Sequence, residues 1–185
     1  MTRWLLWTLA GVILGGIVHL ATILVLPRTA SENAYDRLAP ITQVNVMTPI
    51  PGPTPAKATL PFMDPAFAVA VCRYDLGQGP MKLTVPVGLA YTSVSFYTNR
   101  DIAYYAINDR SAGRRAIELD LMTPAQRAEM PEDEEITAAD RLIVESPSLT
   151  GIIAIRALAP DAGLMPMAKR TIDAARCQRT DVAKK

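Results

Sequence analysis

The sequence predicts a mainly β domain, an antiparallel β-sandwich or small barrel with a C-terminal helix, behind a single N-terminal transmembrane helix and a proline-rich linker. Three observations support this. Residues 4–26 are apolar and uncharged, nearly half of the fifteen prolines fall between residues 39 and 65, and short alternating runs follow from Phe67. The expected boundaries are an anchor over 1–28, a linker over 29–65, a β-rich domain over 66–177 and a disordered tail over 178–185.

Residues 4–26 are long enough to span a membrane, because about 20 apolar residues cross the hydrocarbon core of a bilayer. A cleaved signal has a shorter apolar run followed by small residues, and the end of this run, Leu26-Pro27-Arg28, has no such site. An uncleaved signal-anchor is therefore favoured. Basic residues flank both ends and do not decide the orientation. The short head before the helix favours a domain in the bacterial periplasm, anchored in the inner membrane.

One face of the anchor carries small and polar residues. At 100° per residue this face contains Thr8, Gly11, Gly15, His19 and Thr22. Small residues let two helices approach closely, and threonine and histidine can hydrogen-bond across the pair. Such glycine spacings also arise by chance, but an ionisable residue at membrane depth usually faces protein or water. We expect this face to bind another helix, from a different protein or from a second copy.

The linker over residues 29–65 is expected to be a semi-rigid spacer. Proline cannot continue a helix or occupy a central strand, and proline-rich segments are stiff. The alternative is a docking motif for an SH3-like partner, which is less favoured because nothing in the chain implies such a partner.

The region from Phe67 has the pattern of a strand series. Val94 and Phe96 alternate with Ser93 and Ser95, as in a half-buried strand. Turn signals recur about every ten residues, which is typical of an antiparallel sandwich or barrel. The expected strands cover residues 67–76, 81–87, 90–98, 102–108, 114–121, 141–146 and 151–158. The last is nearly all apolar and is expected to be central.

Two stretches predict helices within the domain. Thr123 is a suitable N-cap, with Pro124 at the first helical position. Residues 161–177 have the pattern of a closing helix, which would bring Cys177 back toward Cys72. Its apolar side carries Met165, Ala168, Ile172 and Ala175.

The two cysteines, Cys72 and Cys177, lie far apart in the chain and form neither a CxxC motif nor a four-ligand zinc site. In the cytosol they would be two small buried residues. In an oxidising periplasm they can pair, and closing so long a loop stabilises a fold by about 2–4 kcal/mol. We expect the disulfide if the domain is exported.

The sequence offers no recognisable catalytic set. The only histidine lies in the anchor, which excludes Ser-His-Asp and Cys-His arrangements in the domain. The acidic run 132–135 lacks the ligand spacing of an EF-hand and is expected to be a solvated loop. A net charge of +1 provides no basic surface for nucleic acid. We therefore expect no enzyme activity and no cofactor.

Tyrosines and arginines between residues 73 and 115 suggest a partner surface, because both residue types are enriched where proteins bind one another. The alternative is that the tyrosines belong to the sheets and the arginines to turns. The candidates are Arg73, Tyr74, Tyr97, Tyr104, Tyr105, Arg110, Arg114 and Arg115.

Five segments taken together resemble a known family: DPAFAVAVCRYDL, KLTVPV, YTSVSFYT, AYYAINDR and ITAADRLIVESP. They are similar to the bacterial envelope family of domain of unknown function 1254 (DUF1254), in its short form with one N-terminal span. CRYDL and TVPV are the most specific parts. The resemblance implies a β-rich fold and brings no catalytic residues. Members are often encoded beside, or fused to, a DUF1214 domain, which implies a membrane or periplasmic partner of that type.

These observations predict a membrane-anchored periplasmic interaction protein, an accessory subunit of an inner-membrane envelope complex. The alternative is a periplasmic domain that holds a small molecule or lipid between strand tyrosines. An enzyme ranks third, and would require a cleft in which carboxylates such as Asp75, Asp109 and Glu118 converge.

Overall fold

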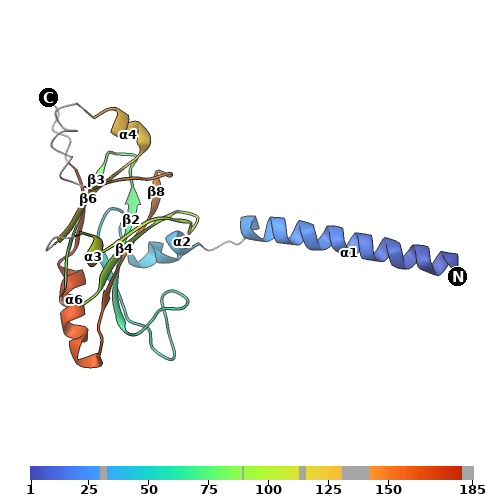
Figure 1. The fold of residues 1–185 in the computed structure, drawn as a ribbon, viewed down its shortest axis with the longest axis horizontal. Helices are drawn as coiled ribbons and strands as arrows, with labels where there is room; N and C mark the ends of the chain where they lie inside the picture. The colour runs from blue at the N-terminus through green and yellow to red at the C-terminus, as the bar shows by residue number, and fades with distance from the viewer. Residues whose placement is uncertain (30–32, 89, 113–115, 131–141, 181–185) are drawn as a thin grey trace. The chain divides into compact units, whose positions relative to one another are not determined.

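The computed structural model describes residues 1–29, 33–88, 90–112, 116–130 and 142–180. The chain forms two compact units, Met1–Asn33 and Ala34–Lys185. The first unit contains the long helix α1, Thr2–Thr29 (Figure 1). Its segment Thr2–Leu26 is long and apolar enough to cross a membrane, and none of it is buried against the chain. This confirms that the expected apolar helix forms.

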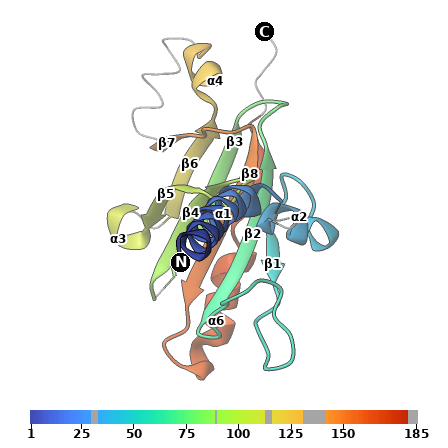
Figure 2. The same cartoon turned by 90° about the vertical axis from the view of Figure 1, so that its right-hand side faces the viewer.

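The second unit contains two sheets (Figures 1 and 2). Within the described residues, one sheet has five strands in the order β1-β2-β8-β4-β5, and the other has four in the order β7-β6-β3-β9. Neighbouring strands are antiparallel except β6 and β7. The strands are β1 Thr48–Ile50, β2 Phe67–Asp75, β3 Met81–Pro86, β4 Thr92–Thr98, β5 Ala103–Asn108, β6 Ala116–Met122, β7 Leu142–Glu145, β8 Thr150–Leu158 and β9 Arg176–Arg179. The predicted mainly β class is confirmed.

Short helices connect and cover the sheets. α4 begins after Thr123, whose hydroxyl accepts a hydrogen bond from the Gln126 backbone while the Gln126 side chain accepts one from Thr123. This capping box confirms the predicted helix start. α6 packs against β2, β8 and β3. The helices are α2 Ala34–Leu38, α3 Asp109–Ala112, α4 Pro124–Ala128 and α6 Met165–Asp173, with 3-10 turns at Ala39–Ile41 and Ala162–Leu164.

In the five-stranded sheet, β2 and β8 are buried on both faces. Cys72 and Ile153 belong to the core between the two sheets, whereas their chain neighbours Val71 and Ile152 belong to a second cluster on the outer face. Successive residues of a strand point to opposite faces, so a strand covered on both sides is apolar throughout. This explains the apolar composition of β8, which lies in the middle of its sheet as predicted.

The closing helix is shorter than predicted. α6 ends at Asp173, and Cys177 lies on β9, where it pairs with Leu83 of β3. Cys177 is buried between exposed neighbours, a period-2 pattern that suits a strand. Gln178 and Arg179, expected in the tail, therefore belong to the sheet. Residues 181–185 lie outside the described residues.

The proline-rich segment is not a separate spacer. The compact unit begins at Ala34 rather than at residue 66. β1 pairs with β2 from Thr48↔Val71 to Ile50↔Val69, and Leu38 is completely buried. Prolines at 49 and 51 are compatible with this pairing because β1 lies at the edge of the sheet.

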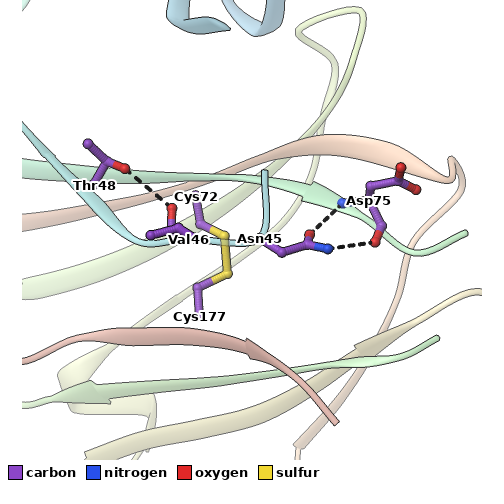
Figure 3. The surroundings of a disulfide bond; sticks show 6 residues. All are labelled: Asn45, Val46, Thr48, Cys72, Asp75 and Cys177. Atoms are coloured by element: carbon purple, nitrogen blue, oxygen red, sulfur yellow. Dashed lines mark hydrogen bonds between the residues drawn. A yellow bond between two sulfur atoms is a disulfide. The ribbon is translucent and has the colours of Figure 1, made fainter. Parts of the chain in front are cut away.

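A disulfide joins Cys72 of β2 to Cys177 of β9 and so links the two sheets (Figure 3). The two Cα atoms are 6.5 Å apart and both residues are buried. The predicted pair is therefore brought together, on two strands rather than on a strand and a helix.

We predict that the chain purified from membranes and denatured without reductant has no thiol that reacts with a maleimide. The double variant Cys72→Ala/Cys177→Ala should lower the free energy of unfolding by about 2–4 kcal/mol, because it releases a long loop in the unfolded state. Urea unfolding followed by circular dichroism measures this. Complete labelling of both cysteines in the unreduced wild type would contradict the prediction.

Candidate functional site on the outer face of the five-stranded sheet

Residues 34–66, which we call the outer layer, include the edge strand β1 of the five-stranded sheet and cover the outer face of β2 and β8. The layer consists of α2, the 3-10 turn Ala39–Ile41, β1 and two loops (Figure 2). Its inward side chains form an apolar cluster with the sheet. Leu38, Ile50, Leu60 and Met63 contribute from the layer, and Val71, Ile152 and Ala154 from the strands.

Arg73 is the central contact between the layer and the sheet. It lies on β2 and is only 8% exposed. Its Nε donates a hydrogen bond to the Thr42 hydroxyl at 2.7 Å, and Nη2 donates to the Thr42 carbonyl oxygen at 3.1 Å. The guanidinium carbon lies 4.9 Å from the ring centre of Tyr35, a cation–π contact. One side chain thus holds both α2 and the loop that follows it.

The electrostatics around Tyr35 keep the phenol neutral. Its partial burial raises the pKa of Tyr35 above the ordinary value, although the positive charge of Arg73 opposes the shift. A neutral ring presents its face to the guanidinium throughout the physiological pH range. The contact is therefore insensitive to pH near neutrality.

Asn45 provides a second attachment. Its backbone N–H donates to the Arg73 carbonyl oxygen at 2.7 Å. Its side chain accepts from the Asp75 N–H at 2.8 Å and donates to the Asp75 carbonyl oxygen at 3.2 Å (Figure 3). Asn45 has a positive φ of 62°, a conformation that asparagine tolerates better than most residues. The Asn45 side-chain amide therefore makes the two backbone hydrogen bonds that a neighbouring strand would make at the end of β2.

Asp101 provides a third attachment, at the first residue of the layer. Its two carboxylate oxygens accept from the Ala34 backbone N–H at 3.2 and 3.1 Å. Asp101 belongs to the turn between β4 and β5, which is closed by a hydrogen bond from the Thr98 N–H to the Ile102 carbonyl oxygen at 2.9 Å. Ala34, the first residue of the β-rich unit, is thus bound to the turn next to β5, which is the edge strand opposite β1.

The expected tyrosine–arginine surface is not a single exposed surface. Tyr74 is completely buried between the sheets, and Arg73 is covered by the outer layer. Tyr97 packs against the outer-face cluster, whereas Tyr104 and Tyr105 pack against the core near Phe96. Arg110 is exposed on α3. Arg114 and Arg115 lie outside the described residues.

The buried tyrosines bond to one another instead of lining a ligand site. The Tyr74 hydroxyl lies 3.1 Å from the Tyr104 hydroxyl and 2.9 Å from that of Ser146. Burial raises the pKa of Tyr104 far above its ordinary value. Gly151 lies opposite Tyr74, and a Cβ there would overlap the Tyr74 hydroxyl and the Tyr97 carbonyl oxygen. The space between the strand tyrosines is therefore filled by the protein itself.

Two hollows lie beside α6 instead. One of about 170 Å³ is lined by Gly88, Thr92, Leu158, Met167 and Thr171. A more open groove of about 400 Å³ runs between the prolines of residues 49–53 and the other side of α6. Both are mainly apolar. Neither has carboxylates in the arrangement that catalysis would require.

The carboxylates considered for an enzyme do not converge. Asp75 pairs with Thr150 at the beginning of β8, whereas Asp109 contacts Thr92, which pairs with Ala157 near the end of β8. Glu118 is exposed on the four-stranded sheet. Among the described residues, no group of histidine, cysteine, aspartate or glutamate side chains could hold a metal ion. The acidic run 132–135 lies outside them.

The polar face of α1 satisfies part of its own hydrogen bonding. The Thr8 hydroxyl donates to the carbonyl oxygens of Trp4 and Leu5, and that of Thr22 donates to the Val18 carbonyl oxygen at 2.8 Å. Apart from the neighbouring residues and backbone of the helix itself, no atom of the described residues lies within 4 Å of a Cβ placed on Gly11 or Gly15. His19 is exposed. Association through this face remains a prediction.

Comparison with known proteins identifies the family. The family model described as "Protein of unknown function (DUF1254)" matches residues 44–179, well over half of the chain. The chain belongs to the DUF1254 family. No curated protein sequence matches it.

One solved structure shows the same fold in a longer protein. The VPA0106 protein of Vibrio parahaemolyticus is 14% identical, with a TM-score of 0.58 over 79% of this chain and 34% of its own. A protein of Burkholderia cenocepacia is 13% identical, with a TM-score of 0.49 over 82% of this chain and 39% of its own. This DUF1254 chain thus spans about a third of the length of the first of them. The likeness to VPA0106 establishes the fold alone.

We predict that Arg73→Ala lowers the free energy of unfolding by about 1.5–3 kcal/mol, because it removes two charge-assisted hydrogen bonds and a ring contact. Arg73→Lys should recover only part of this loss, since an ammonium cannot reproduce the planar fork of a guanidinium. Urea unfolding of the full chain in mild detergent, followed by circular dichroism, gives both values.

The matched control is Arg110→Ala, which removes an exposed arginine and should change the free energy of unfolding by less than about 0.5 kcal/mol. Equal, small effects of Arg73→Ala and Arg110→Ala would show that Arg73 does not hold the outer layer.

Proposed function

We propose that this protein is a membrane-anchored interaction module of the bacterial envelope, an accessory subunit of an inner-membrane complex without catalysis of its own. α1 is the anchor and the β-rich unit, on the periplasmic side, binds a second envelope protein. The observation that carries the proposal is the outer layer, in which Asp101 binds Ala34, the first residue of the β-rich unit, and Arg73 binds Thr42.

Such a connection is suited to limiting the movement of the β-rich unit relative to the membrane. A long flexible linker lets a folded unit sample a large volume, whereas a unit that begins five residues after the last residue of its anchor helix samples a smaller one. The segment between Ala34 and Pro65 could have provided a spacer. It is instead used to cover the sheet.

Two further features support the proposal. A disulfide that links two sheets through a buried core is typical of proteins in an oxidising compartment, and so favours the periplasm. VPA0106 contains the fold as about a third of a longer chain, so there the fold is one part of a larger protein. We infer that the partner here is a separate envelope protein, and a DUF1214-type protein is our first candidate.

We predict that a tagged full-length chain, purified from native membranes in mild detergent, carries one stoichiometric membrane or periplasmic partner. The double variant Gly15→Ile/His19→Leu should lose it, because a bulky side chain prevents close helix approach and the imidazole is removed. Quantitative mass spectrometry of the two preparations measures the loss.

The matched control is Ile13→Ala/Leu24→Ala, which alters the opposite face of the same helix and should retain the partner. If the wild type carries no stoichiometric partner, the proposed function fails. If the partner is retained in all three forms, binding does not use the predicted face of α1.

A further inference from the structure

We propose that the outward side of the outer layer lies on the membrane surface, with the ring of Phe62 inserted among the lipids. Phe62 is fully exposed, although it is a large aromatic residue in a folded unit. Its neighbours Leu60 and Met63 pack inward against the outer-face cluster. Phe62 therefore projects from a loop whose base is fixed on the sheet.

The backbone conformation indicates that the loop around Phe62 has a defined structure. Phe62 has a positive φ of 58°, which is rare for a bulky side chain and persists where the surroundings impose it. Prolines at 61 and 65 restrict the chain on both sides, and the Asp64 side chain accepts a hydrogen bond from the Ala66 N–H at 2.8 Å. The loop thus holds an aromatic ring away from the core in which it could have been buried.

The same layer exposes other apolar side chains. Ile41, Val44 and Val46 are each more than 40% exposed. Outside the layer, Ile102 is also exposed, and it follows Asp101 in the turn that binds Ala34. Exposed apolar residues occur singly on most proteins, but a group on one layer indicates a contact surface. Aromatic side chains in particular are enriched at the membrane interface.

We choose a lipid bilayer as the contact partner of this surface because the anchor helix keeps the β-rich unit close to one. The β-rich unit begins five residues after the last residue of α1. An extended chain covers at most about 3.5 Å per residue, so Ala34 stays within roughly 18 Å of the end of the anchor, whatever the orientation of the two units. The inference therefore rests on the anchoring part of the proposed function.

The charged residues of the outer layer and its neighbouring turn do not favour a purely electrostatic contact with the membrane. The exposed residues of the layer and its neighbouring turn include Arg37, Lys57 and Arg100, but also Asp36, Asp64 and Asp101. With basic and acidic groups balanced, insertion of apolar side chains provides the attraction. We therefore expect contact with zwitterionic phosphatidylcholine as well as with anionic lipid.

The native tryptophans provide an internal control. Both of them, Trp4 and Trp7, lie in α1, so wild-type emission reports the anchor alone. The variant Trp4→Phe/Trp7→Phe/Phe62→Trp places a single tryptophan in the outer layer. The matched control, Trp4→Phe/Trp7→Phe/Glu118→Trp, places it on the exposed face of the four-stranded sheet.

Each full-length form is reconstituted into phosphatidylcholine vesicles with either ordinary or dibrominated acyl chains, because bromine quenches only tryptophans at the hydrocarbon. We expect loss of emission in the brominated vesicles, with a shift to shorter wavelength, for the wild type and for the Phe62→Trp form. The Glu118→Trp form should emit equally in both kinds of vesicle.

The outcomes separate the two proposals. A quenched wild type with an unquenched Phe62→Trp form overturns the membrane contact and leaves the anchor intact. Equal quenching of the Phe62→Trp and Glu118→Trp forms overturns the assignment to this layer. An unquenched wild type shows that α1 is not in the bilayer, and both the inference and the proposed function then fail.

Discussion

The contact of Arg73 with Thr42 and Tyr35 is the interaction on which the rest of the structure depends. A buried guanidinium is costly unless hydrogen bonds and a polarizable neighbour replace the lost water. Thr42 supplies two oxygen acceptors and Tyr35 supplies a ring face, all from the segment that precedes the sandwich. Satisfying this charge therefore requires the outer layer to be in place.

Once the outer layer is fixed, β2 and β8 of the five-stranded sheet lie in the middle of the unit. The inner face of this sheet packs against the second sheet, and the disulfide links β2 to β9 across that core. Its outer face packs against Leu38, Ile50 and the loop residues. A sheet covered on both sides needs apolar residues at nearly every position, which β8 has. The segment that begins at Ala34 is thus packed on this sheet rather than left as a spacer.

Much of this fold could be predicted from the sequence, because strand alternation, turn residues and an N-cap are local signals. The positions of β2 to β8, the central place of β8 and the start of α4 follow from such signals. The pairing of Cys72 with Cys177 was also predictable, although the helix prediction extended too far because Ala174 and Ala175 continue its apolar pattern.

The candidate site was not predictable in the same way. Proline content shows that a segment is not a regular helix or central strand, but it does not show whether the segment packs on a sheet. Arg73 and Tyr74 looked like surface residues because the layer that covers one and the network that binds the other consist of residues distant in the sequence. Phe62 gave no periodic signal, since its position depends on a single positive φ.

The outer layer and the sandwich form one compact unit, which begins five residues after the last residue of the anchor helix α1. Hydrogen exchange of the full chain in lipid nanodiscs, followed by mass spectrometry, tests this most directly. The account predicts that peptides covering residues 34–50 are protected to the same extent as those of β2, because they unfold together. Rapid exchange of residues 34–50 beside a protected β2 would show that they form a flexible linker, and would contradict it.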